Sequence, residues 1–282
     1  LRAAVDAAGS GRVVIPAGSY CLSGTVSLTE GGTWLSGAGI GVTTLSSCGT
    51  NTTLVSLTNV GEMLTGLSLI GKQGGSLPVV TLGSSCIDCF IESLDISGGS
   101  QGIRNEAGEI HFYDISLHNP ASAAIYSTGN IFMSNILIDT HTYAPYAIQF
   151  DTGALEEHLH NVRVTGPFGH AFALTGGRAS FTCSQCSSSG TTGSAAYFAS
   201  GRGAIIIDSS FGPGSENGSS AIEFGSNFEG WSSILGGSAI GAAYGIYIGG
   251  GSDNIVDGVQ TSGSVKGIGV AASVSNYKID ST

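Results

Sequence analysis

A short pattern of alternating apolar and polar residues recurs along the chain. Each copy opens on a polar residue and continues with apolar residues at alternate positions, as in Asp114-Ile115-Ser116-Leu117. Five successive copies place their apolar anchors 21, 21, 26 and 24 residues apart, at Leu94, Ile115, Ile136, Val162 and Cys186. A second alternating strand follows at a loop's distance, at residues 102–104, 124–126, 147–149 and 171–173. Because a repeat of this length cannot bury its apolar face alone, the pattern predicts a solenoid of stacked coils.

The repeat predicts one domain over residues 1–282. We expect about 10–12 coils between residues 13 and 279, with a capping helix at residues 1–9. The chain opens directly in this helix, and we therefore expect it to be part of a longer protein. The composition agrees with an all-β fold, since 46 glycines and an apolar fraction of 41% suit short strands joined by tight turns.

Stacking brings equivalent residues of successive coils to about 4.8 Å from one another, so sequence offsets define columns of neighbouring side chains. One such column directly precedes the anchors. We interpret it as a structural ladder of polar side chains at a turn, formed by Asp114, Asn135, Asn161 and Gln185.

The balance of charges argues against two classes of partner. The formal net charge is −11, and Lys and Arg form no cluster, so we expect no binding to nucleic acid. The sequence has no run of about 18 apolar residues, so we expect no insertion into a membrane. The acidity itself is explained by solubility alone.

The six cysteines include two pairs with the spacing Cys-x-x-Cys, at residues 86 and 89 and at residues 183 and 186. This spacing occurs in half a zinc site and in redox motifs. In the repeat alignment, however, Cys183 and Cys186 fall on core columns. We therefore interpret both pairs as buried thiols that act as small apolar side chains, and we expect no metal ion and no cofactor. Cys21 and Cys48 lie in neighbouring coils and could pair, which the sequence leaves open together with the redox compartment.

Three segments near the beginning of the chain carry a resemblance to a known family. They are Leu1-Arg2-Ala3-Ala4-Val5-Asp6-Ala7-Ala8, Val13-Val14-Ile15-Pro16-Ala17-Gly18-Ser19-Tyr20 and Trp34-Leu35-Ser36-Gly37-Ala38-Gly39. Together they resemble the opening of the pectate-lyase-like right-handed parallel β-helix superfamily. This group includes rhamnogalacturonase-like and polygalacturonase-like hydrolases, polysaccharide lyases, epimerases and phage tailspike depolymerases. The resemblance implies a single-stranded right-handed β-helix with a capping helix, a polysaccharide as partner and, for a tailspike, a homotrimer. It assigns no catalytic residue, because no catalytic motif of the family is present.

All six histidines lie between residues 111 and 170. His111 and His158 share a column with Phe132, which is typical of a surface position.

His118 and Asp139 each follow their anchor by three residues, so we expect them to be neighbours on adjacent coils. A histidine beside a carboxylate can act as a general acid or base, although the two could equally form a surface hydrogen bond. Further side chains of the same loop region, suited to binding a sugar carboxylate or a developing negative charge, are His141, Tyr146, Arg163 and His170.

The strand after each loop presents a second column, in which aromatic and hydrogen-bonding side chains mix. Its outward positions are Arg104, Tyr126, Gln149, Ala173, Tyr197, Glu223, Tyr247 and Gly269. Aromatic rings stack on sugar faces while polar groups hold hydroxyls, so the column suits a saccharide chain. Tyrosine is also simply common on exposed strands. From this column we take Arg104, Tyr126 and Gln149 as candidate substrate-binding residues.

Two residues further along the same strands, Glu106 and Asp151 fall in register two coils apart. The expected separation of about 9–10 Å lies near the upper limit for the two carboxyl groups of an inverting glycosidase. We therefore take Asp139, Asp151, Glu106 and His118 as candidate catalytic residues.

Together with these candidate residues, the resemblance implies a polysaccharide-degrading enzyme of the phage tailspike type, located outside the cell or on a virion, that acts on a bacterial-surface or plant-type acidic polysaccharide. Hydrolysis is favoured over elimination, because lyases of the resembling family often use calcium and no triple cluster of carboxylates is visible. The alternative is a non-catalytic β-helical fibre or adhesin. The low charge suits this alternative, as does the scarcity of candidate catalytic residues after Ser180.

Overall fold

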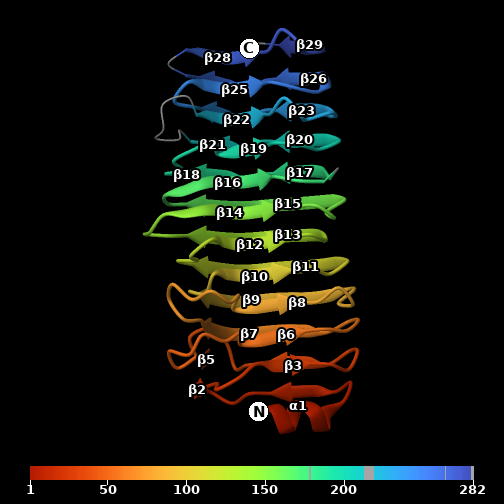
Figure 1. Ribbon diagram of the computed structural model, residues 1–282, viewed down its shortest axis with the longest axis vertical. Helices are drawn as coiled ribbons and strands as arrows, with labels where there is room; N and C mark the ends of the chain where they lie inside the picture. Colours follow the sequence, from red (N-terminus) through yellow and green to blue (C-terminus); the bar gives the residue numbers. More distant parts are fainter. Residues whose placement is uncertain (178, 213–218, 264, 281–282) are drawn as a thin grey trace. The chain divides into compact units, whose positions relative to one another are not determined.

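A computed structural model describes residues 1–177, 179–212, 219–263 and 265–280 of the chain (Figure 1). The protein is nearly all β, with 3% helix and parallel strands that form about 11 solenoid turns. It divides into two compact units, Leu1–Ile138 and Asp139–Thr282, which we call unit 1 and unit 2 and describe one at a time. The parallel β-solenoid expected from the repeat is confirmed, and the single domain stays a prediction.

In both units the strands alternate between two parallel sheets, named here sheet A and sheet B. Sheet A of unit 1 consists of β1 (Arg12–Val14), β2 (Gly18–Cys21), β4 (Trp34–Ser36), β5 (Thr43–Ser46), β7 (Met63–Ile70), β9 (Cys89–Ser97), β11 (Glu109–His118) and β13 (Asn130–Asp139). Sheet B of unit 1 consists of β3 (Val26–Leu28), β6 (Val55–Leu57), β8 (Val80–Leu82), β10 (Gln101–Asn105) and β12 (Ala123–Ser127).

The strands of unit 2 are shorter on average in sheet A. These are β15 (Glu156–Thr165), β17 (Ser180–Ser184), β18 (Ser187–Ser189), β20 (Gly203–Ile207), β21 (Ser210–Phe211), β23 (Trp231–Leu235), β24 (Ser238–Ile240), β26 (Ser252–Asp257), β27 (Gln260–Ser262) and β29 (Ser275–Asp280). Sheet B of unit 2 consists of β14 (Ala144–Phe150), β16 (Phe168–Leu174), β19 (Ala196–Phe198), β22 (Ser220–Phe224), β25 (Tyr244–Ile248) and β28 (Lys266–Val270).

The helix α1 (Arg2–Ala8) covers the end of unit 1, as Figure 1 shows. It packs against β1 and β3 and buries Val5. The helix ends at Gly9, whose φ of 54° suits a residue without a Cβ. The expected capping helix is therefore confirmed. Among the described residues, no helix has the length and apolar character needed to cross a membrane.

The register of the strands confirms the predicted anchor column within each unit. In unit 1, Leu94 pairs with Leu67 on one side and with Ile115 on the other. In unit 2, Arg163 pairs with Ser187, which aligns the preceding anchors of the two strands. Equivalent side chains thus stack coil upon coil, and the sequence offsets do identify neighbours.

Each of these coils bends at one residue with a positive φ. Such residues directly precede the anchors, with φ between 51° and 58°, and are Ser93, Asp114, Asn135, Asn161 and Gln185. At the bend two consecutive side chains point outward, because the left-handed residue interrupts the alternation of the strand. In β11, for example, Tyr113 and Asp114 are exposed while Phe112 and Ile115 are buried. Asn135 Nδ2 donates to Asp114 Oδ1 at 3.0 Å, as expected for a structural ladder.

The two units fill their cores differently. Unit 1 is packed mainly with Leu, Ile and Val, and Phe112 is its one phenylalanine among the largest fully buried side chains of the described residues. Unit 2 has a core of phenylalanine rings, at positions 150, 168, 172, 181, 198, 211, 224 and 228. The Phe198 ring lies 5.1 Å from that of Phe181 and 4.9 Å from that of Phe224. Such ring pairs add to the free energy of burial.

The cysteines correct one sequence prediction. Both Cys-x-x-Cys pairs are buried, as expected, but each pair forms a disulfide and neither consists of free thiols. Cys21 and Cys48 form a third disulfide, with Cα atoms 5.5 Å apart. The two cysteines of each Cys-x-x-Cys motif can meet because the third residue of the motif, Asp88 or Gln185, has a positive φ. In a straight strand residues i and i+3 face opposite sides, whereas this bend turns both cysteines inward.

Candidate functional site

The outer face of sheet B in unit 2 carries the predicted column of aromatic and polar side chains. The register pairs Gln149 with Ala173, Ala173 with Tyr197, Tyr197 with Glu223, and Glu223 with Tyr247. The column is therefore confirmed as a row of neighbours in this unit. Its chemical role stays a prediction.

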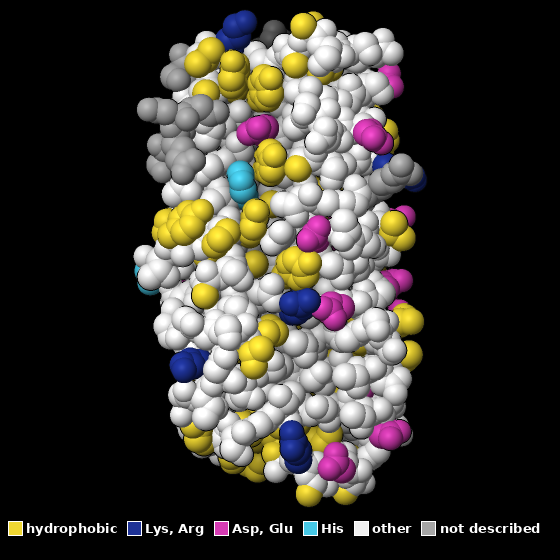
Figure 2. Space-filling view, in the orientation of Figure 1, with side chains coloured by type: hydrophobic (Ala, Val, Ile, Leu, Met, Phe, Trp, Pro, Cys, Tyr) yellow, Lys and Arg dark blue, Asp and Glu magenta, His cyan; other side chains and the backbone are white. Residues whose placement is uncertain are grey.

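Three rings form a continuous stack across this face. The ring of His170 lies 5.9 Å from that of Tyr146 and 4.8 Å from that of Tyr197, with interplanar angles of 23° and 17°. Over β16 and its neighbours, Figure 2 shows histidine and hydrophobic side chains beside one another. We name Tyr146, His170 and Tyr197, together with Ser194 and Glu223, the aromatic platform.

Glycine at two positions makes room for the stack. A Cβ on Gly193 would lie 2.7 Å from the carbonyl oxygen of Gly169 and 3.1 Å from Cε1 of His170. A Cβ on Gly169 would lie 2.5 Å from the carbonyl oxygen of Pro145. Any larger residue would push neighbouring backbone or the His170 ring away, so these glycines hold the rings at stacking distance.

Hydrogen bonds fix the orientation of the platform. His170 Nδ1 lies 2.6 Å from the carbonyl oxygen of Ser194. Because a carbonyl oxygen only accepts, Nδ1 carries the proton, so in the uncharged form of the ring Nε2 is the acceptor. Ser194 Oγ donates to Glu223 Oε2 and accepts from the backbone N–H of Ser220. The serine thus joins the histidine to the carboxylate.

The protonation state of Tyr197 follows from its surroundings. Burial raises the pKa of the Tyr197 hydroxyl above its usual value, and negative charge on Glu223 and then on Tyr146 raises it further. At neutral pH this hydroxyl is therefore a hydrogen-bond donor rather than a base. A hollow of about 180 Å³ adjoins the rings. Its walls are Tyr143, Pro145, Tyr146, Gly169, His170, Thr192 and Gly193.

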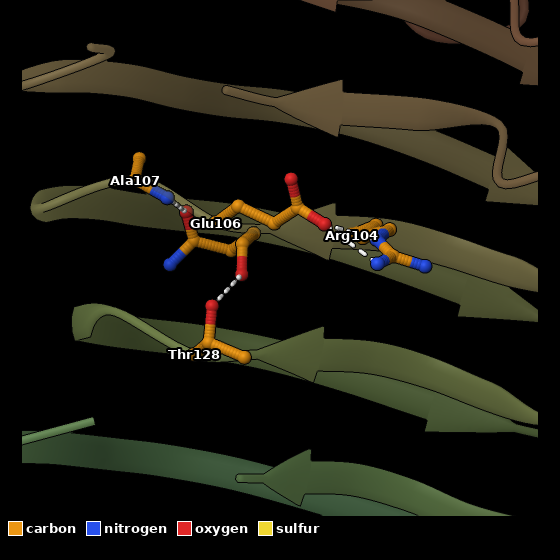
Figure 3. A network of polar contacts seen from close by, with 5 residues as sticks. Arg104, Glu106, Ala107 and Thr128 are labelled. Carbon is orange, nitrogen blue, oxygen red and sulfur yellow. Dashed lines mark hydrogen bonds and ion pairs between the residues drawn. The ribbon is translucent and has the colours of Figure 1, made fainter. Parts of the chain in front are cut away.

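In unit 1 the same sheet presents a different surface. Arg104 pairs with Tyr126 in the register and lies over its ring, 5.4 Å from the centroid. Figure 3 shows the Arg104 and Glu106 side chains pointing toward one another along β10, with Nη2 and Oε1 2.6 Å apart. Thr128 follows β12, where its backbone N–H donates to the carbonyl oxygen of Asn105. Glu106, the predicted catalytic carboxylate of this unit, is therefore engaged in an ion pair with Arg104.

His118 has a partner that the sequence did not predict. Its Nε2 lies 3.0 Å from Asp95 Oδ1, although the register places Asp95 opposite Ser116 and Ser97 opposite His118. The histidine side chain therefore reaches diagonally across the sheet. His118 and Glu106 belong to unit 1, whereas Asp139 and Asp151 belong to unit 2. The predicted pairs of His118 with Asp139 and of Glu106 with Asp151 therefore stay predictions.

The remaining predicted residues of unit 2 are dispersed around the platform's strands. Asp151 follows β14 and accepts the backbone N–H of Thr152 at 2.8 Å. Gln149 Nε2 donates to Thr175 Oγ1 at 3.1 Å. Arg163 is exposed on β15 of sheet A, and His141 is exposed in the loop before β14. Among the predicted residues of unit 2, Tyr146 and His170 are in contact through their stacked rings.

Sequence reasoning left three platform residues out of the candidate site. Tyr197 and Glu223 were already in the predicted column, but they follow Ser180, in coils where candidate catalytic residues are scarce. Ser194 carried no signal of its own. Choosing binding candidates along the whole column, and not only up to Gln149, would have included the first two.

Asp88, Glu109 and His111 bring one potential ligand atom each to within 4.8 Å of one another. The His111 ring is held between Phe90 and Phe132, with centroids 4.8 and 5.2 Å away. Its Nε2 lies 3.8 Å from Glu109, and its Nδ1 is buried without a hydrogen-bond partner. A cation on Nε2 would force the proton onto Nδ1, where nothing accepts it. This cluster is poorly suited to a metal.

Comparisons with known proteins identify the fold. No protein-family model matches the sequence, and no curated protein matches it. Among solved structures, the catalytic unit of a GH87 α-1,3-glucanase from Streptomyces thermodiastaticus matches 100% of the chain with a TM-score of 0.65 and 14% identity. The A-module of the mannuronan C-5 epimerase AlgE4 from Azotobacter vinelandii matches 99% of the chain and 90% of its own length, with a TM-score of 0.63 and 15% identity. A GH87 α-1,3-glucanase catalytic domain in complex with tetrasaccharides has a TM-score of 0.57, 12% identity and 96% coverage of this chain, which matches 64% of that domain.

The chain spans 66% of the length of the Streptomyces glucanase chain that it matches. At these identities the similarity shows the parallel β-helix fold that the sequence resemblance implied, and nothing finer.

Proposed function

We propose that this protein is carbohydrate-active and that its aromatic platform binds a polysaccharide chain. The stack of Tyr146, His170 and Tyr197 is the observation that carries the proposal. The stacked rings present one ring edge per coil along the sheet, and donors and acceptors beside them can hold the hydroxyl groups of successive sugars. The Tyr197 hydroxyl supplies a donor, and His170 Nε2 and Glu223 supply acceptors. The likeness to a glucanase and an epimerase that act on polysaccharides supports the same class of ligand.

Binding is tested by affinity electrophoresis of the full chain in gels that contain α-1,3-glucan, mannuronan, pectic polymers or bacterial capsular polysaccharides. We expect retardation by at least one polymer, and its loss in His170→Ala and Tyr197→Ala. Trp231→Ala is the matched control, because Trp231 is an aromatic residue exposed to 43% on sheet A of the same unit. Equal retardation of all three variants and the wild type would refute binding at the platform.

Cleavage of the bound chain is the second candidate function, as in a tailspike-type depolymerase. The similar solved structures include glycoside hydrolases of the same fold, which supports this candidate. Glu223 lies three coil steps from the row of Asp151, or about 14 Å along the sheet, which exceeds the separation of about 6.5–9.5 Å in an inverting glycosidase. Hydrolysis would therefore use another pair from the candidates Asp139, Asp151, Glu106 and His118.

A reducing-end assay on each polymer tests cleavage, and ultraviolet absorbance of an unsaturated product distinguishes elimination from hydrolysis. Binding without cleavage would favour the alternative, a glycan-binding fibre or adhesin. A location outside the cell or on a virion is part of the proposal, and the three disulfides support it because such bonds persist in oxidising compartments. A homotrimer is also proposed, and light scattering on the purified protein tests it.

A further inference from the structure

A buried carboxylate lies in unit 1, directly before β7. Glu62 precedes β7 and is fully buried. Its Oε2 accepts the backbone N–H groups of Thr58 and Asn59 at 2.7 and 3.0 Å, whereas its Oε1 is buried without a hydrogen-bond partner. An unpaired buried oxygen of this kind costs free energy unless a proton or a cation satisfies it. Nothing in the proposed carbohydrate site uses this residue.

Two sulfur atoms lie beside this carboxylate. The Sγ atoms of Cys86 and Cys89 and a carboxylate oxygen of Glu62 all lie within 4.8 Å of one another, and all three residues are fully buried. Cys89 Sγ is also 3.1 Å from the backbone carbonyl oxygen of Asn59. Two sulfur atoms, one carboxylate and one backbone carbonyl group therefore lie close together.

These donors match the chemistry of a thiophilic cation. A dithiol or phosphine reductant supplies two electrons to the Cys86–Cys89 bond, and two protons from solvent complete the two thiols. A divalent cation that binds them displaces both protons and leaves two thiolates. Two thiolates with a carboxylate form three of the four ligands of a tetrahedral Zn²⁺ site, and a carbonyl or water completes it.

We propose that reduced Cys86 and Cys89, together with Glu62, form a binding site for a thiophilic divalent cation such as Zn²⁺. The disulfide and the metal complex are then alternative states of the same three residues. The bend at Asp88, which turns both cysteines inward, holds their Cα atoms 5.9 Å apart. The site does not depend on the proposed carbohydrate function.

The second Cys-x-x-Cys motif provides an internal control. Cys183 and Cys186 have the same spacing, the same burial and a similar Cα separation of 6.0 Å. Among the described residues, no Asp, Glu or His joins them in a group of three potential ligands. With only two ligands, this pair should bind a cation much more weakly.

The test uses Co²⁺, whose bonds to thiolates give a charge-transfer absorption band. The full chain is unfolded, refolded with a phosphine reductant so that burial does not limit access, and titrated with Co²⁺. Far-ultraviolet circular dichroism of each sample confirms folding. We expect one Co²⁺ per chain with a thiolate band in the wild type and in Cys183→Ser/Cys186→Ser. We expect no band in Cys86→Ser/Cys89→Ser or in the oxidised protein.

Glu62→Gln keeps the shape of the side chain and both sulfurs, and we expect it to weaken Co²⁺ binding at least about tenfold. A refolded, reduced wild type without a band would overturn the proposal. So would a band that Cys183→Ser/Cys186→Ser abolishes and Cys86→Ser/Cys89→Ser retains. If Cys86→Ser/Cys89→Ser fails to refold, the comparison of Glu62→Gln with the wild type decides, and equal affinity of the two would refute the site.

Discussion

Sheet B has the same register in both units but presents different outer surfaces. In unit 1 its central column begins with small hydroxyl side chains and ends in the contact of Arg104 with Tyr126, with the members Ser27, Ser56, Thr81, Arg104 and Tyr126. In unit 2 the equivalent column includes Tyr197, Glu223 and Tyr247 and adjoins the His170 stack. Because the backbone pairing is alike, the difference lies entirely in the outward side chains. A solenoid can therefore change its outer surface within a few coils without changing its fold.

The cores differ in parallel with the surfaces. Unit 1 buries branched aliphatic side chains, whereas unit 2 buries a series of phenylalanines. The rings occupy more volume per position, and Gly201 leaves space for one of them, since a Cβ there would lie 2.9 Å from the Phe228 ring. Four predictions test how far this contrast extends, in order of decreasing effect.

Phe198→Ala should cause the largest loss of stability. The ring contacts Phe181, Phe224 and Phe228 in the core of unit 2, and such truncations typically cost about 3–5 kcal/mol. Urea denaturation gives the free energy of unfolding. Leu94→Ala in unit 1 should cost less on average, about 2–5 kcal/mol. A loss below about 1 kcal/mol for Phe198→Ala would show that the aromatic core of unit 2 is loosely packed.

The buried Glu62 should make the oxidised protein less stable as pH rises. Burial raises the pKa of Glu62 from 4.5 to about 7, against the lowering effect of the Asn59 and Thr58 N–H groups. Between these values the unfolded chain has lost the proton that the folded protein keeps, so unfolding becomes easier with rising pH. The effect is at most about 3 kcal/mol and ends above about pH 7, where both states are ionised.

Glu62→Gln is the control for this pH dependence, because it cannot titrate. The difference in unfolding free energy between about pH 5 and about pH 8 should shrink in the variant. Equal differences in the two proteins would mean that Glu62 ionises as readily in the folded protein as in the unfolded chain.

Gly193→Ala should weaken polysaccharide binding without removing any ring. The new Cβ would displace the His170 ring or the Gly169 carbonyl, so the stack would open. We expect the Kd obtained from the retardation to rise roughly tenfold, which corresponds to about 1.4 kcal/mol of binding free energy. Gly83→Ala in unit 1 is the matched control, because its Cβ would meet its nearest neighbour at an ordinary 3.7 Å. Unchanged binding by Gly193→Ala would separate ligand recognition from the stacking geometry.

The smallest expected effect concerns the residues with a positive φ that directly precede the anchors. Gln185 has a φ of 55° in a position where unit 1 places Asp114 and Asn135. Asn tolerates this conformation better than Gln does, so Gln185→Asn should stabilise the protein by about 0.5–1 kcal/mol. Thermal unfolding measures the gain. Gln185→Ala keeps the conformational strain and should bring no gain, and stabilisation by both substitutions would point to another cause.

The fold was predictable because one physical rule, the stacking of equivalent residues, acts on every coil. The anchor column, the bend ladder and the outward column of sheet B all follow from sequence offsets. Contacts that cross columns could not be predicted in this way. His118 reaches Asp95 diagonally, and His170 stacks on Tyr197 although Ala173 is the paired residue. Offsets locate a Cα atom, but the direction of a long side chain depends on its rotamer and on the room that neighbours such as Gly193 leave.

The disulfides illustrate the same limit. The alignment placed the cysteines in the core, and burial confirms this for both Cys-x-x-Cys pairs. It could not show that the sulfurs face each other, because that depends on the positive φ at Asp88 and Gln185. A polar residue just before the second cysteine is the sequence signal that could have indicated the bend.

The recurring bend also makes the coils interchangeable in principle. Asn161, Gln185 and Asp208 all have a positive φ of similar size, at 51°, 55° and 45°. The backbone N–H of Gln185 already donates to the carbonyl oxygen of Ile207, one coil further along. Removing the residues between two such bends would remove one complete coil. Chain length in this protein can therefore change by whole coils, and with it the number of side chains in each outward column.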